Sequence, residues 1–184
     1  MVSLPDFDPN RTPVGDAEAL FNRVTLGVYE MGSTFKALTA AMALDTGVVS
    51  PDDGYDASAP LRLARFTITD FHAQNRWLSV PEILVHSSNI GAAKMALDVG
   101  AERQRDYLAR FGMLAPPPVE LAEIGRPLVP GDWRELTTAT VGFGHGIAVS
   151  PLQLAAGVAA LVNGGVLNPP TVLAGDGGAP RRVS

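Results

Sequence analysis

The sequence predicts a mainly α-helical fold. Helix start signals, helix stop signals and apolar stripes of helical spacing recur along the chain, whereas the alternating segments typical of strands are scarce. Hydrophobic residues make up 46% of the 184 residues, which is enough for a core. We therefore expect one domain, or a piece of a larger one, with too few strands for a complete five- or six-stranded sheet.

The expected elements follow in order from local signals. Residues 1–16 predict a looped lead-in and residues 17–28 a short helix or turn. Ser150-Pro151 is a typical N-cap followed by proline at the first helical position, and Asp45-Thr46-Gly47 is a typical stop. Helices are expected over residues 33–44, 80–85, 89–100, 101–111, 133–141 and 151–162, and loops with one short strand at 66–69 over residues 48–78.

Composition excludes several function classes. The net charge of -5 and the pI near 5.1 argue against nucleic-acid binding. The chain has no cysteine, which excludes disulfides and thiolate metal sites. No apolar run approaches the roughly 18 residues of a membrane-spanning helix.

Ser33-Thr34-Phe35-Lys36 is the first candidate for chemistry. A hydroxyl and an amine three positions apart on a helix share a face, and an amine can activate a serine nucleophile if burial lowers the pKa of the lysine. The apolar run after Lys36 favours such burial, and a helix start offers free N–H groups and a positive dipole end to an oxyanion. The competing interpretation is an N-cap serine beside a surface lysine.

Two further segments carry candidate residues. Ser87-Ser88-Asn89 precedes an expected helix; Ser87 is a candidate proton relay and the Asn89 amide a candidate for binding a substrate amide, but serine and asparagine are also ordinary helix caps. Gly142-Phe143-Gly144-His145-Gly146 predicts a bend with positive φ angles. The chain has three histidines, His72, His86 and His145, without the spacing of a metal site, so no metal and no cofactor are expected.

Tyr29-Glu30-Met31-Gly32-Ser33-Thr34-Phe35-Lys36 resembles the active-site segment of class B penicillin-binding proteins, which usually has proline where Met31 stands. Ser87-Ser88-Asn89 resembles their Ser-x-Asn segment. Residues 3–10 and 142–153 resemble segments of the septal, cell-division branch of these peptidoglycan D,D-transpeptidases. The four matches occur in the order of the family and cover nearly the whole chain.

The resemblance implies roles for six residues. Ser33 is the acylated nucleophile, Lys36 its activating base and Ser87 a proton relay. Asn89 binds the acyl-side amide of the substrate, and Ser88 and Gly144 belong to the substrate-binding set. The implied substrates are peptidoglycan stem peptides ending in D-Ala-D-Ala, and β-lactams, which resemble that end, acylate the same serine. The full-length protein is implied to bind division-complex membrane proteins on the periplasmic side of the inner membrane, with no anchor in this chain and no nucleic acid as partner.

One family segment is missing. The Lys-Thr/Ser-Gly strand expected downstream of the glycine-rich segment is absent, because Lys94 is followed by Met95 and no later lysine exists. Residues 1–170 are therefore expected to be the helical lobe of the mixed α/β fold of serine β-lactamases and transpeptidases, without most of its central sheet. Residues 171–184 are expected to form a flexible tail that ends before the third segment. We expect this chain alone to be acylated very slowly or not at all, since losing one oxyanion donor typically costs about 10²–10³ in rate.

Two other hypotheses stay open at this point. The first is a β-lactamase-like serine hydrolase or sensor, which also uses Ser-x-x-Lys. The second is a non-catalytic scaffold that binds cell-division partners, for which the missing third segment is the main support.

Overall fold

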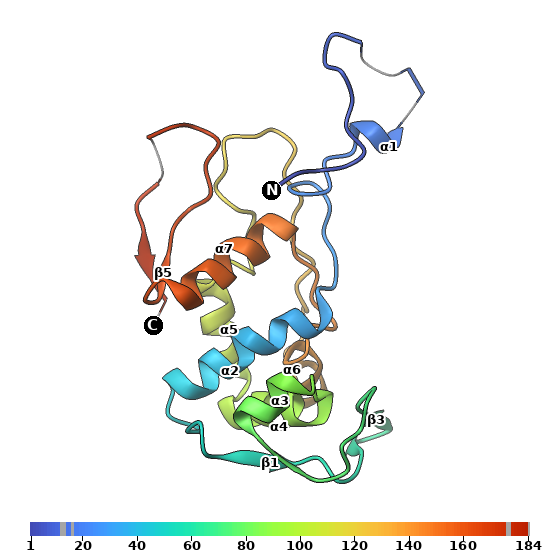
Figure 1. The fold of residues 1–184 in the computed structure, drawn as a ribbon, viewed down its shortest axis with the longest axis vertical. Coiled ribbons are helices and arrows are strands. Elements are labelled where there is room, and N and C mark those ends of the chain that lie inside the picture. The colour runs from blue at the N-terminus through green and yellow to red at the C-terminus, as the bar shows by residue number, and fades with distance from the viewer. Residues whose placement is uncertain (12–13, 16, 176–177, 184) are drawn as a thin grey trace. The chain divides into compact units, whose positions relative to one another are not determined.

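The computed structural model describes residues 1–11, 14–15, 17–175 and 178–183 (Figure 1). Parts of the predicted lead-in and of the predicted tail therefore lie outside the described residues. The chain forms two units. The first unit comprises residues 1–29, 109–128 and 148–183, and the second comprises residues 30–108 and 129–147. Each of them is built from segments that lie far apart in the sequence.

The second unit is mainly helical. Its helices are η1 (Gly32–Thr34, a 3-10 turn), α2 (Phe35–Asp45), α3 (Val80–Val85), α4 (Asn89–Val99), α5 (Ala101–Arg110, which ends in the first unit) and α6 (Glu135–Val141). Helix α4 packs against α2 on one side and α6 on another, and α3 contacts both α2 and α4 (Figure 1). The contact faces are apolar, with Leu38, Ala93 and Ala139 fully buried. Burial of this stripe from each helix is the main driving force for the bundle.

Two short strand pairs complete the second unit. Strand β1 (Gly54–Asp56) pairs with β4 (Trp77–Ser79) and β2 (Leu61–Leu63) with β3 (Phe66–Ile68), both antiparallel. Only the strand at 66–68 was predicted. The other three were not predicted, because each is only three residues long and lies among turn residues without the four-residue alternation of Phe66-Thr67-Ile68-Thr69.

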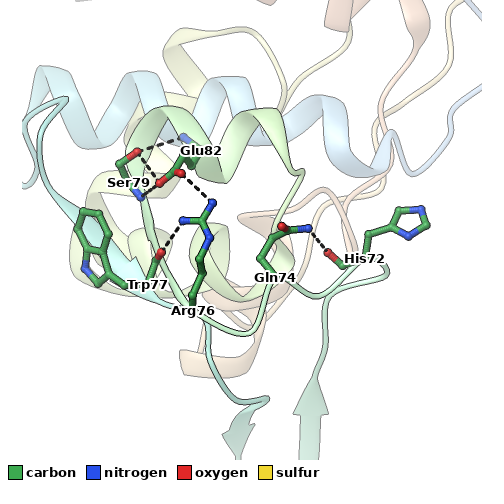
Figure 2. Close-up of polar contacts among 6 residues, drawn as sticks. All are labelled: His72, Gln74, Arg76, Trp77, Ser79 and Glu82. Atoms are coloured by element: carbon green, nitrogen blue, oxygen red, sulfur yellow. Dashed lines mark hydrogen bonds and ion pairs between the residues drawn. The ribbon is translucent and has the colours of Figure 1, made fainter.

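Helix α3 begins at a capping box (Figure 2). The Ser79 hydroxyl accepts from the Glu82 N–H, while the Glu82 carboxylate accepts from the Ser79 N–H at 2.9 Å. The Arg76 guanidinium donates to the same carboxylate at 2.8 Å and to the Trp77 carbonyl at 2.9 Å. The hydrogen bond from Arg76 is the main reason why the pKa of Glu82 is lowered to about 2. This network fixes where β4 ends and α3 starts.

The first unit contains α1 (Ala17–Leu20), α7 (Pro151–Val162) and the antiparallel pair β5 (Val166–Leu167) and β6 (Arg181–Arg182). Ser150 caps α7 as predicted and forms a capping box with Gln153. The Gln153 amide also donates to the carbonyls of Gly112 and Ala115, both at 2.8 Å, and so ties α7 to the 109–128 segment. Single bridges join Tyr29 to Val149 and Leu128 to Ala148.

The mainly α prediction is confirmed, with two shifted helix starts. Residues 32–34 form a 3-10 turn, so α2 begins at Phe35 rather than at Ser33. Helix α6 begins at Glu135 rather than at Trp133. Helix ends often tighten into 3-10 turns, and sequence patterns do not resolve boundaries of one or two residues. No helix in the described part of the chain is both long and apolar enough to cross a membrane.

Candidate active site

Ser33 and Lys36 lie on one face of the start of α2. Ser33 belongs to the 3-10 turn and is exposed, while Lys36 is in the first turn of the α-helix and is only 3% exposed. The Lys36 Nζ donates to the Ser33 Oγ at 3.0 Å. The predicted pairing of a serine and a lysine three positions apart is therefore present in the structure.

Burial lowers the pKa of Lys36, and this favours the neutral amine that can act as a base. Desolvation lowers its pKa from 10.5 to about 8, and the negative charge of Asp70 partly opposes this shift. At pH 7 the neutral amine fraction then rises from about 0.03% to about 9%. A lysine can act as the base here only if burial lowers its pKa, and Lys36 meets this condition.

Ser87 reaches the same amine from the end of α3. The Ser87 N–H donates to the Leu84 carbonyl and the Ser88 N–H to the Ile83 carbonyl, the pattern of a Schellman motif. Such a motif requires positive φ at the position after the cap, and Ser87 has φ +53° where glycine is usual. A non-glycine residue there costs about 1–2 kcal/mol. The Ser87 Oγ accepts from the Lys36 Nζ at 2.9 Å, and its carbonyl accepts from the same atom.

Ser88 and Asn89 form the junction between α3 and α4. Ser88 is buried; its hydroxyl accepts from the Gly91 N–H at 2.9 Å as the N-cap of α4 and donates to Asp70 at 2.7 Å. The Asn89 Nδ2 donates to the Thr69 carbonyl at 3.0 Å. Ser88 is thus occupied as a cap, whereas Asn89 keeps a carbonyl oxygen and a second N–H for other partners.

Asp70 was not singled out from the sequence. It follows β3, and its carboxylate accepts from the Ser88 hydroxyl and, at 2.9 Å, from the Ile90 N–H. It therefore caps α4 from a distant segment and also acts electrostatically on Lys36. Eighteen residues separate Asp70 from Ser88, and no local motif marks such a contact.

The glycine-rich segment fastens onto the turn that carries Ser33. Gly144 has φ +81°, and its carbonyl accepts from the Gly32 N–H at 3.2 Å. A Cβ on Gly144 would lie 2.1 Å from the Gly32 carbonyl oxygen, so only glycine fits. Two more contacts hold the segment: the Gly146 N–H donates to Glu30 at 2.7 Å and the Thr39 hydroxyl to the Gly142 carbonyl at 2.8 Å.

The predicted bend is confirmed at two of its three glycines. Gly144 and Gly146 have positive φ, whereas Gly142 has φ -56° and caps α6 in an ordinary helical conformation. The ring of His145 lies 5.2 Å from that of Phe143. Within the described ranges, no group of three or more His, Asp or Glu residues is placed to hold a metal ion.

The arrangement is suited to nucleophilic catalysis. One amine lies within hydrogen-bond distance of two serine hydroxyls, one exposed at a helix start and one at a strained turn. A neutral amine there can accept a proton from either hydroxyl. Glu30 and Asp70, which hold the surrounding turns, are the site residues that sequence reasoning missed.

Comparisons with a protein family and with named relatives match this chain to transpeptidases. The family described as "Penicillin binding protein transpeptidase domain" matches residues 1–177. The chain is 45% identical, over 94% of its length, to the probable peptidoglycan D,D-transpeptidase FtsI of Caulobacter vibrioides, and 32% identical, over 92%, to the peptidoglycan D,D-transpeptidase FtsI of Escherichia coli K12. It spans about 29% of the length of each of these relatives.

Solved structures agree at the level of the fold. A peptidoglycan glycosyltransferase from Burkholderia ambifaria has a TM-score of 0.83 at 28% identity, covering 88% of this chain and 53% of that one. The TP domain of penicillin-binding protein 3 from Burkholderia pseudomallei has a TM-score of 0.81 at 30% identity, covering 88% and 50%. These matches confirm the predicted fold class, the helical lobe of a transpeptidase-type domain.

Proposed function

Because the chain belongs to the penicillin-binding protein transpeptidase domain family, we propose that it carries the serine acyl-transfer centre of a peptidoglycan D,D-transpeptidase. The observation that carries this proposal is the position of the Lys36 Nζ, 3.0 Å from the Ser33 Oγ and 2.9 Å from the Ser87 Oγ. The lowered pKa of Lys36, about 8, raises the fraction of neutral amine that is available to act as the base at neutral pH.

In the acylation step, neutral Lys36 accepts the proton of the Ser33 hydroxyl while the Oγ attacks the carbonyl carbon of the D-Ala-D-Ala bond. The Ser33 N–H supplies one oxyanion donor at the helix start. When the C–N bond breaks, the departing D-Ala amine takes a proton that passes from Lys36 through Ser87. The result is an ester on Ser33 and free D-Ala.

In the second step, the amine of a neighbouring strand attacks the ester. Ser87 passes a proton from that amine to Lys36, and Ser33 recovers its proton as the ester bond breaks. A new amide cross-link forms with no net change in protons. A β-lactam takes the first step in the same way, and its ring opens as the ester forms.

The substrate-binding residues have different roles in this proposal. The Asn89 amide binds the acyl-side amide of the donor. Ser88, buried under the cap of α4, acts by holding Ser87 and Asn89 in place. Gly144 acts in the same indirect way, through its contact with Gly32.

The biological setting is also a proposal. We propose that the full-length protein cross-links stem peptides at the division septum from the periplasmic side of the inner membrane, together with division-complex membrane proteins. Support comes from the names of the FtsI relatives and from the segments at 3–10 and 142–153. We also propose that residues 1–170 belong to the transpeptidase domain and that residues 171–184, which include β6, form its tail.

The two alternative hypotheses are less well supported. The FtsI relatives carry transpeptidase names rather than β-lactamase names. A non-catalytic scaffold gives no reason for a buried lysine between two serine hydroxyls, since burial of an amine that has no carboxylate in direct contact among the described residues costs stability.

The test is acylation of Ser33 followed by mass spectrometry. We expect millimolar benzylpenicillin to add slowly, over hours, to Ser33 of this chain, faster above pH 8 than at pH 7. Ser33→Ala and Lys36→Met should abolish the adduct. Lys94→Met is the matched control because Lys94, the other lysine, donates to the Asp56 carbonyl away from Ser33. An adduct on another residue, or one that Lys36→Met leaves unchanged, would contradict the proposed mechanism.

A further inference from the structure

A pocket of about 370 Å³ lies within the first unit. Its walls come from the end of α5 and the turn after it, from residues 115–118, from α7, and from β5 and β6 with the residues that flank them. The described residues that line it all belong to the first unit, whereas Ser33, Lys36, Ser87 and Asn89 belong to the second. Ligand pockets typically measure about 300–1,000 Å³, so this pocket has room for one small molecule.

Proline rings form a large part of the pocket lining. Pro116, Pro117 and Pro118 come from one segment, and Pro169 and Pro170 follow β5; together we call these five residues the proline wall. Each ring fixes its φ angle and lacks an N–H, so the proline wall is stiff, apolar and poor in hydrogen-bond donors. Proline-rich segments of other proteins are bound by grooves lined with aromatic rings. The same pairing favours an aromatic ring as the part of a ligand that contacts this wall.

Arg181 is the one charged residue among the described residues that line the pocket. Its Nη2 donates to the carbonyls of Ala109 and Arg110, both at 2.9 Å, at the C-terminal end of α5. The same atom lies 3.7 Å from the point where a Cβ on Gly112 would stand, and Gly112 also lines the pocket. These contacts hold the guanidinium head, and not only the apolar stem of the side chain, at the pocket wall.

The charge of this guanidinium can be complemented by a ligand. No carboxylate of the described residues forms an ion pair with Arg181. Its two bonds to the end of α5 occupy the Nη2 atom, whereas the Nε and Nη1 groups have no acceptor within the described ranges. Arginine suits carboxylates, which accept charge-assisted hydrogen bonds from it. The described lining contains no acidic residue that would repel an anion.

We infer that this pocket binds a small aromatic carboxylic acid, with the ring against the proline wall and the carboxylate at Arg181. The pocket volume, near the lower end of the usual range, limits the ring system to one or two fused rings. The inference goes beyond the proposed acyl transfer and does not depend on it, because every residue proposed for that reaction belongs to the second unit.

Titration of the ¹⁵N-labelled chain with 2-naphthoate, followed by NMR, tests the inference. We expect saturable binding with a Kd of about 1 mM, which is ordinary for a ligand of this size. The amide signals of Gly112, Ala156 and Leu167, which line the pocket, should shift. The probe 2-naphthamide has the same rings without the charge, and it should bind about tenfold more weakly because hydrogen bonds between charged groups are the stronger ones.

Two pairs of variants separate the charge from the apolar wall. Arg181→Gln should weaken 2-naphthoate binding about tenfold, to the level of 2-naphthamide, whereas Arg182→Gln removes the same charge from the next residue of β6 and should leave the affinity unchanged. Ala156→Trp on α7 should fill the pocket and abolish the shifts, whereas Ala155→Trp adds the same ring at an exposed neighbouring position and should not. Ala179→Trp fills the pocket from another segment if Ala156→Trp does not fold.

Three results would overturn the inference: no saturable shift at the pocket amides, equal affinity for 2-naphthoate and 2-naphthamide, or unchanged binding in a folded filling variant. The comparison of the two probes uses the native chain, so it tests the role of the charge even if Arg181→Gln does not fold. A dimer in sedimentation experiments that Ala156→Trp dissociates, without 2-naphthoate binding, would assign the pocket to a second copy of the chain instead. Ser33→Ala should bind 2-naphthoate like the native chain, and acylation by benzylpenicillin is scored separately, so either proposal can fail without the other.

Discussion

Replacing Gly144 by alanine should destabilise the second unit and disturb Ser33 at the same time. Two costs add at this position. A side chain at φ +81° costs about 1–2 kcal/mol. In addition, the new Cβ would lie 2.1 Å from the carbonyl oxygen of Gly32 and 2.8 Å from its carbonyl carbon and nitrogen. These are backbone atoms that no rotamer change can move, so overpacking adds about 1–3 kcal/mol. The expected loss of unfolding free energy is therefore about 2–5 kcal/mol.

The contact cost can be separated from the backbone cost within the same unit. Gly47 has φ +68°, and no atom lies within 4 Å of the point where its Cβ would stand, so Gly47→Ala should cost only about 1–2 kcal/mol. Both tryptophans of the chain, Trp77 and Trp133, belong to the second unit, so urea unfolding followed by their fluorescence reports on that unit. A loss for Gly144→Ala no larger than that for Gly47→Ala would refute the close approach of the glycine-rich segment to Gly32.

The other predictions concern Lys36 and the turn around it. Because the pKa of Lys36 is about 8 in the folded chain and 10.5 when unperturbed, the unfolded chain holds more protons between these values, and stability should rise with pH across that window. Urea unfolding at pH 7–10.5 should show this rise in the native chain and lose it in Lys36→Met. Asp70→Asn removes a charge that favours the ammonium form, so the window should start below pH 8 in the same measurement. Ser88→Ala removes the cap on Gly91 and should cost about 1–2 kcal/mol by tryptophan fluorescence. Ser87→Gly relieves positive-φ strain and should gain about 1 kcal/mol while slowing acylation of Ser33; a stable variant with unchanged acylation would argue against the relay role of Ser87.

The helices could be predicted from the sequence because their signals are local. Ser150 and Ser88 mark helix starts through bonds to residues three positions away, and apolar spacing shows the buried face of each helix. The pairing of Ser33 with Lys36 is local in the same sense, since three residues along a helix bring two side chains together. Even there the sequence did not show that Ser33 lies in a 3-10 turn ahead of α2.

The contacts that complete the site are not local. Asp70 reaches Ser88 across 18 residues, and Glu30 reaches Gly146 across 116. Both carboxylates accept hydrogen bonds from backbone N–H or hydroxyl groups at turns, which no local sequence pattern marks. Their positions depend on how α2, α4 and α6 pack, which is decided by burial over the whole second unit rather than by a motif.

Three features of the fold together set the protonation of Lys36. Burial under the α2 start favours the neutral amine, while the Asp70 charge favours the ammonium form. The Ser87 carbonyl, in the turn after α3, also accepts a hydrogen bond from the Lys36 Nζ, which favours the ammonium form. With a pKa of about 8, both forms are populated near neutral pH. An acyl transfer that first removes a proton from Ser33 and then returns one to a leaving amine needs both forms in turn, so a more buried or a more tightly paired lysine would speed one half of the reaction and slow the other.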